Sequence, residues 1–289
     1  MKSQIKELKL ICLSCSSFQK VLAMYFTDEY WVCPNCQMKI SMHSNDINLD
    51  SWAEKSANSD LIFRFKMILK KAPKISMFLG HLLGPLLADF KIEVSRTLRE
   101  FQFTSNPKIV NLGSGTSDYG KDVINVDFIR YKNVDLVLDI CNLPFENDQF
   151  DLVVLTEVLE HVENPYTVIK EAHRILKRGG SILITSPFMI GFHASPNDFQ
   201  RFTIPGLKYL LKGFTVSKIK SYGPTGSLMW IFQEWLALWL SFGSKKLHMI
   251  WLVFFMVITS PIKLLDIVLN RNPLSSNIAS TYFILAKKN

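Results

Sequence analysis

The stretch that decides the fold reads Ile-Val-Asn-Leu-Gly-Ser-Gly, from Ile109 to Gly115. A short apolar run that ends in two closely spaced glycines is typical of a buried strand followed by a tight turn. Further apolar runs follow along the chain, each separated from the next by turn-forming or helical sequence. The first five expected strands are 109–112, 123–126, 135–138, 151–155 and 181–185.

The clearest helical pattern covers residues 159–176 and ends in Lys177-Arg178-Gly179-Gly180, which supplies basic residues and a glycine stop. Two later runs, 214–219 and 281–286, are the expected sixth and seventh strands. This alternation predicts an α/β fold, a Rossmann-like doubly wound sheet with helices on both faces. The connection between the first two strands is short compared with the usual crossover of about a dozen residues, so we expect a stunted or missing helix there.

Polar residues follow four successive strands at the point where each strand ends, which is where such sheets bind ligands. A glycine turn can present backbone N–H groups to a ligand, and a carboxylate can accept two hydrogen bonds from ribose hydroxyls. The candidate cofactor-binding residues are Asn111, Gly113, Ser114, Gly115, Asp127, Asp139, Ile140 and Thr156.

Residues 111–187 resemble the class I S-adenosylmethionine (SAM)-dependent methyltransferases of the type 11 group. The matching segments are Leu112-Gly113-Ser114-Gly115, Val126-Asp127, Leu143-Pro144-Phe145, Phe150-Asp151-Leu152-Val153, Val158-Leu159-Glu160-His161-Val162 and Arg174-Ile175-Leu176-Lys177-Arg178-Gly179-Gly180. The resemblance implies a seven-stranded sheet and SAM as cofactor. It also implies that Gly113 and Gly115 contact the methionine part of SAM, Asp127 the ribose, and Asp139 with Ile140 the adenine.

Two positions depart from the family pattern. Asn111 stands where the family usually has an acid, and Ser117 stands in place of a third glycine. A degenerate, non-catalytic domain is therefore an alternative. A Rossmann dehydrogenase is disfavoured, because the third glycine is absent and Asp127 follows the glycines too early.

The segment from His193 to Thr203 gathers His, Asp and Arg after the fifth strand. It resembles the substrate-side segment of the same methyltransferases, which makes His193 the candidate base, with Asp198 and Arg201 as further catalytic candidates. Asp198 either orients His193 or pairs with Arg201, and such a pair alone would only shape the loop. His161 is a weaker candidate, because a histidine at a helix start more often packs or caps.

Two Cys-x2-Cys pairs near the start of the chain, Cys12 with Cys15 and Cys33 with Cys36, have the spacing of a structural zinc ribbon. Four thiolates complete a closed tetrahedral shell around one Zn²⁺ ion. Residues 21–25 and 29–32 are expected to form the hairpin strands between the pairs. The stretch resembles the Trm112-like zinc ribbons. We favour a ribbon that braces the fold over one that docks a partner.

The expected organisation is a zinc ribbon at 1–50, a linker with helices at 51–103, and a methyltransferase domain at 104–289. The linker part holds a polar stretch at 44–60 and a basic amphipathic pattern at 61–69, followed by a helix at 86–101. Hydrophobic residues make up 48% and charged residues 20%, which excludes a mostly disordered chain. The polar first ten residues lack a secretory signal, and paired cysteines suit a reducing compartment, so we expect a cytoplasmic protein.

The last third of the chain is basic, because residues 188–289 carry 11 Lys/Arg against 3 Asp/Glu. Within it, a hydrophobic insertion at 226–269 precedes the last strand. The second apolar run of the insertion, 247–265, approaches the ~20 residues needed to cross a bilayer. Because the last strand returns to the same sheet, the insertion crosses twice or not at all. Two crossings would place the basic turn at Lys245 and Lys246 outside and bury Gln233 and Glu234. We favour a helical hairpin in the membrane interface. An integral hairpin, or packing against the core or another subunit, is the alternative.

These observations predict a peripherally membrane-associated SAM-dependent methyltransferase with a structural zinc ion. The expected acceptor is a lipid-linked, glycan-intermediate or other amphipathic small molecule, such as a polyprenyl compound or a quinone. The alternatives are an RNA or protein methyltransferase that docks through its ribbon and basic surface, which we do not favour, and a non-catalytic scaffold. The sequence does not specify an oligomeric state.

Overall fold

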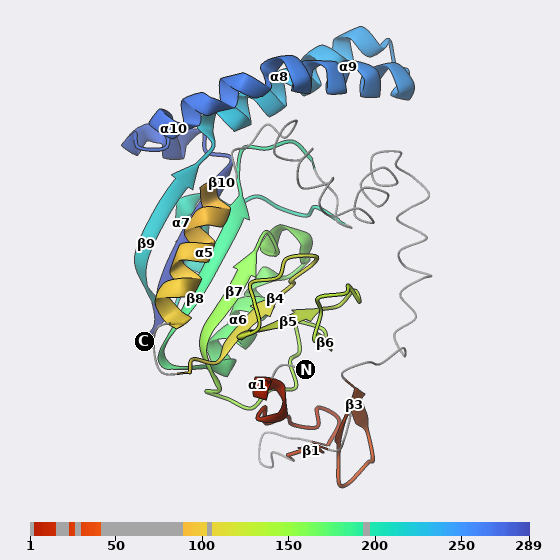
Figure 1. Ribbon diagram of the computed structural model, residues 1–289, viewed down its shortest axis with the longest axis vertical. Helices are drawn as coiled ribbons and strands as arrows, with labels where there is room; N and C mark the ends of the chain where they lie inside the picture. Colours follow the sequence, from red (N-terminus) through yellow and green to blue (C-terminus); the bar gives the residue numbers. More distant parts are fainter. Residues whose placement is uncertain (1–2, 16–22, 27–29, 42–88, 103–105, 193–196) are drawn as a thin grey trace.

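The structure is a computed structural model that describes residues 3–15, 23–26, 30–41, 89–102, 106–192 and 197–289 (Figure 1). The linker expected at 44–60 and the amphipathic helix expected at 61–69 lie outside these residues.

A seven-stranded sheet forms the centre of the molecule, with the strand order β6-β5-β4-β7-β8-β10-β9. Its strands are β4 (Ile109–Leu112), β5 (Val123–Asp127), β6 (Leu136–Val137), β7 (Phe150–Thr156), β8 (Leu176–Pro187), β9 (Phe214–Tyr222) and β10 (Thr281–Lys288). The strands from β6 to β8 pair in parallel, and β10 runs antiparallel between β8 and β9. This topology confirms the predicted Rossmann-like methyltransferase fold.

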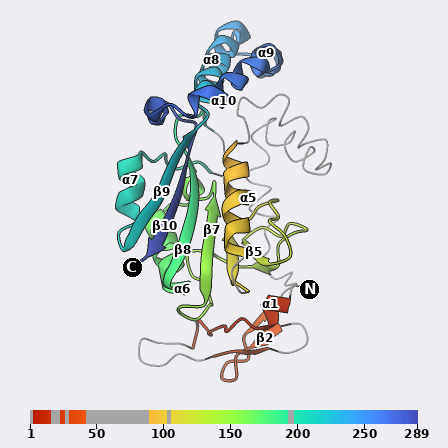
Figure 2. The ribbon, with the colours of Figure 1, turned by 60° about the vertical axis from the view of Figure 1, so that its left-hand side comes forward.

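Helices cover both faces of the sheet (Figure 2). On one face lies α5 (Asp89–Gln102), whose Val94 and Leu98 pack in a cluster with residues of the central strands. On the other face lie α6 (Pro165–Ile175) and α7 (Ile204–Leu210), which contribute to the larger buried cluster. The apolar strand residues are buried on both sides, as a sheet sandwiched between helices requires.

The connection from β4 to β5, residues 113–122, consists of turns and contains no helix, as the short spacing predicts. The helix expected at 159–176 is shorter than predicted. Leu159–His161 form a 3₁₀ turn, and α6 begins only at Pro165, because a proline favours the first helical position and disfavours helix before it.

The glycine stop expected at residues 177–180 is instead an irregularity within β8. Phe150 pairs with Leu176, and the next pair is Leu152 with Ser181, so the intervening residues of β8 bulge out of the ladder. The strand therefore begins at Leu176, earlier than the expected 181–185.

The N-terminal module contains α1 (Ser3–Lys6) and a three-stranded antiparallel sheet of β1 (Tyr25–Phe26), β2 (Tyr30–Val32) and β3 (Lys39–Ser41). Residues 21, 22 and 29 of the two expected strands lie outside the described residues, and β3 was not predicted. Leu10 forms an isolated antiparallel bridge with Phe145, and the backbone N–H of Ile11 donates to the carbonyl of Pro144 at 2.7 Å. The module thereby packs directly against the main sheet.

The insertion between β9 and β10 is helical throughout most of its length. It contains α8 (Pro224–Ser241), α9 (Lys245–Thr259), the 3₁₀ segment η2 (Ser260–Leu265), α10 (Asp266–Leu269) and the 3₁₀ segment η3 (Pro273–Asn277). Both β8 and β9 are antiparallel to β10, so β9 ends at the same edge of the sheet as the parallel strands. The α8–α9 hairpin therefore extends from the ligand-binding edge (Figure 1).

Candidate functional site

A cavity of about 710 Å³ opens at the carboxyl ends of the parallel strands. Seven of the eight cofactor residues predicted from the sequence line it, namely Gly113, Ser114, Gly115, Asp127, Asp139, Ile140 and Thr156. Asn111 does not. Its side chain is fully buried and donates through Nδ2 to Oδ1 of Asn125 at 3.1 Å. Further lining residues that the sequence did not single out include Phe128, Tyr131 and Thr167. Glu157, which follows Thr156 at the end of the fourth expected strand, lines the cavity as well.

The turn after β4 is built around Gly113 and is held by Asp127 at the end of β5 and by Asn133 in the loop that follows. Gly113 has a φ of +68°, and a Cβ atom there would lie 2.7 Å from Cγ2 of Val158, so any other residue would be strained and would displace Val158. Oδ2 of Asp127 accepts the backbone N–H of Gly115 at 2.7 Å. Nδ2 of Asn133 donates to the carbonyls of Gly115 and Ser117 at 3.1 and 2.8 Å. The turn is thus preorganised against the cavity.

The residues present fit a nucleoside-bearing cofactor. Asp127 is buried at the cavity wall, where its two carboxylate oxygens accept the backbone N–H groups of Gly115 and Ile129. A carboxylate can accept more than two hydrogen bonds, so these contacts are compatible with a bound ribose. Oγ of Ser114 is buried, lines the cavity and has no hydrogen-bond partner among the described residues. Both are arranged to bind ribose or amino-acid groups.

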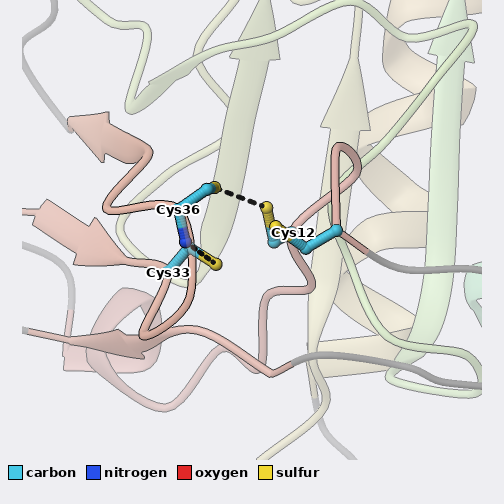
Figure 3. A group of neighbouring side chains, drawn as sticks. Cys12, Cys33 and Cys36 are labelled. Atoms are coloured by element: carbon cyan, nitrogen blue, oxygen red, sulfur yellow. Dashed lines mark hydrogen bonds between the residues drawn. The ribbon is translucent and has the colours of Figure 1, made fainter.

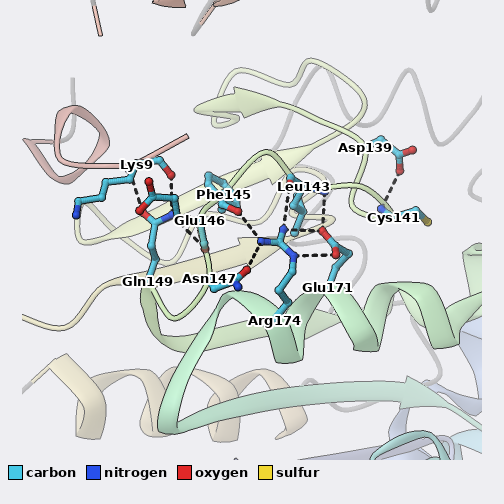
Figure 4. Close-up of polar contacts among 10 residues, drawn as sticks. All are labelled: Lys9, Asp139, Cys141, Leu143, Phe145, Glu146, Asn147, Gln149, Glu171 and Arg174. Atoms are coloured by element: carbon cyan, nitrogen blue, oxygen red, sulfur yellow. Dashed lines mark hydrogen bonds and ion pairs between the residues drawn. The ribbon is translucent and has the colours of Figure 1, made fainter. Parts of the chain in front are cut away.

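The other end of the cavity, at Asp139 and Ile140, is followed by a loop that the ribbon and α6 hold in place (Figure 4). Arg174 donates to the carbonyls of Leu143 and Phe145 at 2.8 and 2.6 Å. Leu143 and Phe145 are fully buried core residues rather than part of the cavity wall.

From the opposite side, Nε2 of Gln149 donates to the carbonyl of Lys9, and Oε1 of Gln149 accepts the N–H of Lys9 at 2.9 Å (Figure 4). The N–H of Glu146 also donates to the carbonyl of Lys9, at 3.1 Å. These contacts support the bracing role of the ribbon.

Two acids were not named as catalytic candidates: Glu157, which lines the cavity, and Glu160, which is fully buried. Burial raises the pKa of Glu157 to about 7. Burial, and then the neighbouring charge of Glu157, raises the pKa of Glu160 to about 9. Both carboxyl oxygens of Glu160 lack a hydrogen-bond partner among the described residues, although Nε2 of His161 lies 3.5 Å from Oε1. Glu160 is therefore neutral at physiological pH.

The loop after β8 carries the residues predicted to be catalytic. Asp198 and Arg201 form an ion pair, with Nη2 of Arg201 donating to Oδ2 of Asp198 at 2.6 Å. His193 lies outside the described residues, so its role as base remains a prediction. Neither Asp198 nor Arg201 is among the described residues that line the cavity, whereas their neighbours Asn197 and Phe199 are. The pairing with Arg201 is the second of the two arrangements that the sequence allows.

The four cysteines of the N-terminal module converge. The Sγ atoms of Cys12, Cys15, Cys33 and Cys36 all lie within 4.8 Å of one another, and those of Cys12 and Cys36 are 3.6 Å apart (Figure 3). The backbone N–H groups of Asn35 and Cys36 point to Sγ of Cys33 at 3.4 and 3.5 Å. Thiolates that accept N–H groups around a central point fit a tetrahedral zinc ion.

The fold and the site together define the class of a Rossmann-like methyltransferase. Residues 116–184 match the family described as the methyltransferase domain. The chain carries a methyltransferase domain.

Sequence relatives are each similar to part of this chain. A demethylmenaquinone methyltransferase of Staphylococcus saprophyticus is 31% identical over 30% of this chain and 48% of that protein. An uncharacterised protein of Methanocaldococcus jannaschii is 51% identical over 15% of this chain and 21% of that protein. The chain thus spans less than half the length of each of these relatives.

Among solved structures, a 1,6-didemethyltoxoflavin-N1-methyltransferase of Burkholderia thailandensis is similar over 90% of this chain and 99% of that one. The sequence identity is 11% and the TM-score is 0.46.

Proposed function

We propose that this protein is a SAM-dependent methyltransferase that acts at a membrane surface on a lipid-linked or otherwise amphipathic acceptor. SAM supplies an electrophilic methyl group on a sulfonium sulfur. The protein's part is to bind the cofactor and to hold the acceptor in line, because positioning can supply most of the catalysis of such a displacement. Asp127, Ser114 and the glycine turn would hold the cofactor, with Asp139 and Ile140 at the adenine end.

The observation that carries the proposed acceptor class is the apolar surface of the insertion. Most of the exposed large apolar side chains among the described residues lie between Leu228 and Ile278, with Trp239 exposed by 70% and Phe242 by 88%. Soluble proteins rarely expose so much contiguous apolar surface unless it binds a membrane or a partner. This surface extends from the edge of the sheet that carries the cavity.

The polar groups of the hairpin favour an interfacial position. Gln233 donates to Thr259 between α8 and α9, and Oε2 of Glu234 lies 3.0 Å from Nε2 of His248. These groups are paired between the helices, which leaves the apolar side chains on the outside. The segment Lys245–Leu269 is long and apolar enough to cross a membrane by length and composition, and it is the one such helix among the described residues.

Charge supports an anionic lipid surface as the occupant of this face. Lys245 and Lys246 are exposed at the tip of the hairpin, and Arg271 is exposed at its base. Each basic residue near an anionic bilayer contributes about 1 kcal/mol to binding. The similarity to the Staphylococcus demethylmenaquinone methyltransferase is consistent with a lipid-soluble acceptor.

The experiment is vesicle sedimentation of the full chain against a variant in which a short Gly/Ser linker replaces residues 226–269. The full chain should pellet with phosphatidylcholine–phosphatidylglycerol vesicles, and salt should weaken the binding without abolishing it, because the apolar contribution is not screened. The variant should stay in the supernatant and bind SAM as the full chain does. A full chain that remains in solution with vesicles would contradict the membrane part of the proposal, and a chain that binds no SAM would contradict the enzymatic part.

A further inference from the structure

Gly191 and Trp230 join the loop that follows β8 to the hairpin. A Cβ atom on Gly191 would lie 2.4 Å from Nε1 and 2.9 Å from Cδ1 of Trp230. Real Cβ atoms do not approach other atoms so closely, so the absence of a side chain at Gly191 is what allows the indole to pack there. Helix α8 therefore rests directly on the backbone of this loop.

Arg201 connects the loop at Gly191 with the segment beside the cavity through hydrogen bonds. Its Nη2 donates to the carbonyl of Gly191 at 3.3 Å and to Oδ2 of Asp198 at 2.6 Å. The backbone N–H of Phe199 donates to the carbonyl of Glu160 at 2.8 Å, and Phe199 lines the cavity. One set of contacts thus connects the hairpin with the cavity wall.

Two phenylalanines at the two ends of this connection are exposed. Phe192 is 76% exposed and directly follows the glycine that touches Trp230. Phe199 is 47% exposed while it lines the cavity. Two exposed aromatic side chains therefore belong to the loop that connects the hairpin with the cavity wall.

We propose that Phe192 and Phe199 insert into the membrane interface together with the hairpin, so that the cavity opens onto the bilayer. An acceptor with an apolar tail then presents its polar head to the cavity while the tail stays among the lipids. Trp230 is a positioning residue, because it holds Gly191 and thereby the orientation of Phe192. This inference rests on the proposed function for the acceptor, but its membrane contact is measurable without one.

The test measures partition of the full-length protein into phosphatidylcholine–phosphatidylglycerol vesicles. The change Phe192→Asp should weaken partition about tenfold, because burial of an aromatic side chain contributes about that factor. The matched control is Tyr209→Asp, which removes a 66% exposed aromatic side chain from α7. The control should partition as the wild type does, and all three proteins should bind SAM equally.

A double-mutant cycle tests the role of Trp230. In a Trp230→Ala background, Phe192→Asp should change partition by less than about twofold, because the loop no longer holds position 192 toward the lipid. An equal loss in both backgrounds would overturn the positioning role of Trp230. Wild-type partition of Phe192→Asp would overturn the inference while leaving the proposed function in place. Failure of the wild-type protein itself to bind vesicles would instead contradict the membrane part of the proposed function.

Discussion

Asp127 and Gly115 join the ends of two neighbouring parallel strands, because Oδ2 of the carboxylate accepts the glycine N–H at 2.7 Å. The acid at the end of β5 therefore shapes the glycine turn that follows β4. Both residues line the cavity, so one side chain serves the local structure of the turn and the binding of a cofactor.

The change Asp127→Ala should lower SAM affinity by roughly ten- to a hundredfold, because hydrogen bonds to a charged group contribute about 1.5–3 kcal/mol. Calorimetric titration with SAM measures the effect, and circular dichroism checks that the variant is folded. Asp127→Asn is the matched control of equal size and should lose less. Unchanged affinity in the alanine variant would place the cofactor site elsewhere.

The purified protein should contain about one equivalent of zinc, which Cys33→Ser should release, because the four Sγ atoms lie close enough together to bind one ion as a unit. Elemental analysis of protein purified under reducing conditions provides the measurement. Cys141→Ser removes a cysteine outside the cluster and should retain the metal. Wild-type protein without zinc would refute the zinc site.

Glu160 should make the fold less stable as pH rises. Its folded pKa of about 9 exceeds the ordinary value of 4.5, so the folded state binds a proton that the unfolded state releases, and stability falls between these two pH values. Glu160→Gln removes this dependence and should be more stable than the wild type near pH 9. Free energies of unfolding, measured with denaturant at several pH values for the wild type and for Glu160→Gln, test this. If Glu160 were ionised in the folded protein, the two free energies would change with pH in parallel.

Glu93 should give stability the opposite pH dependence, because its contribution should be lost in acid. Burial alone would raise its pKa, but hydrogen bonds from Lys218 and Lys220 outweigh this and lower the pKa to about 2. The carboxylate therefore stabilises the contact of α5 with β9 above pH 4.5, and the contribution is lost as pH falls toward 2.

Glu93→Gln should accordingly cost about 1–3 kcal/mol at neutral pH, with the difference from the wild type narrowing in acid. Unfolding free energies measured at several pH values test this. A difference that stays constant in acid would show that the lysine pairing does not depend on the charge of Glu93.

The strands and the order in which the functional segments follow them along the chain were predictable from the sequence. Buried parallel strands are short apolar runs that end in turn residues. The missing helix after Gly113 was also predictable, since too few residues connect β4 with β5. The start of α6 at Pro165 was missed although the proline was visible, because the apolar pattern from residue 159 continued through it.

Features that depend on contacts between residues far apart in the sequence could not be predicted from the sequence. The bridge between Leu10 and Phe145, and the approach of Trp230 to Gly191, join residues far apart in sequence with no local signal. The buried acid Glu160 was quoted within a family motif, but only the fold shows that its carboxyl group has no hydrogen-bond partner among the described residues.

Transfer of a labelled methyl group from SAM into cell fractions tests the central claim most directly. Purified full-length protein is incubated with membranes, RNA and soluble protein from the same cells, and label is counted after organic extraction. The account predicts label in the extracted lipid fraction, lost in Asp127→Ala. Label confined to RNA or to precipitated protein would contradict the proposed acceptor class, and no incorporation into any fraction would contradict the methyltransferase activity itself.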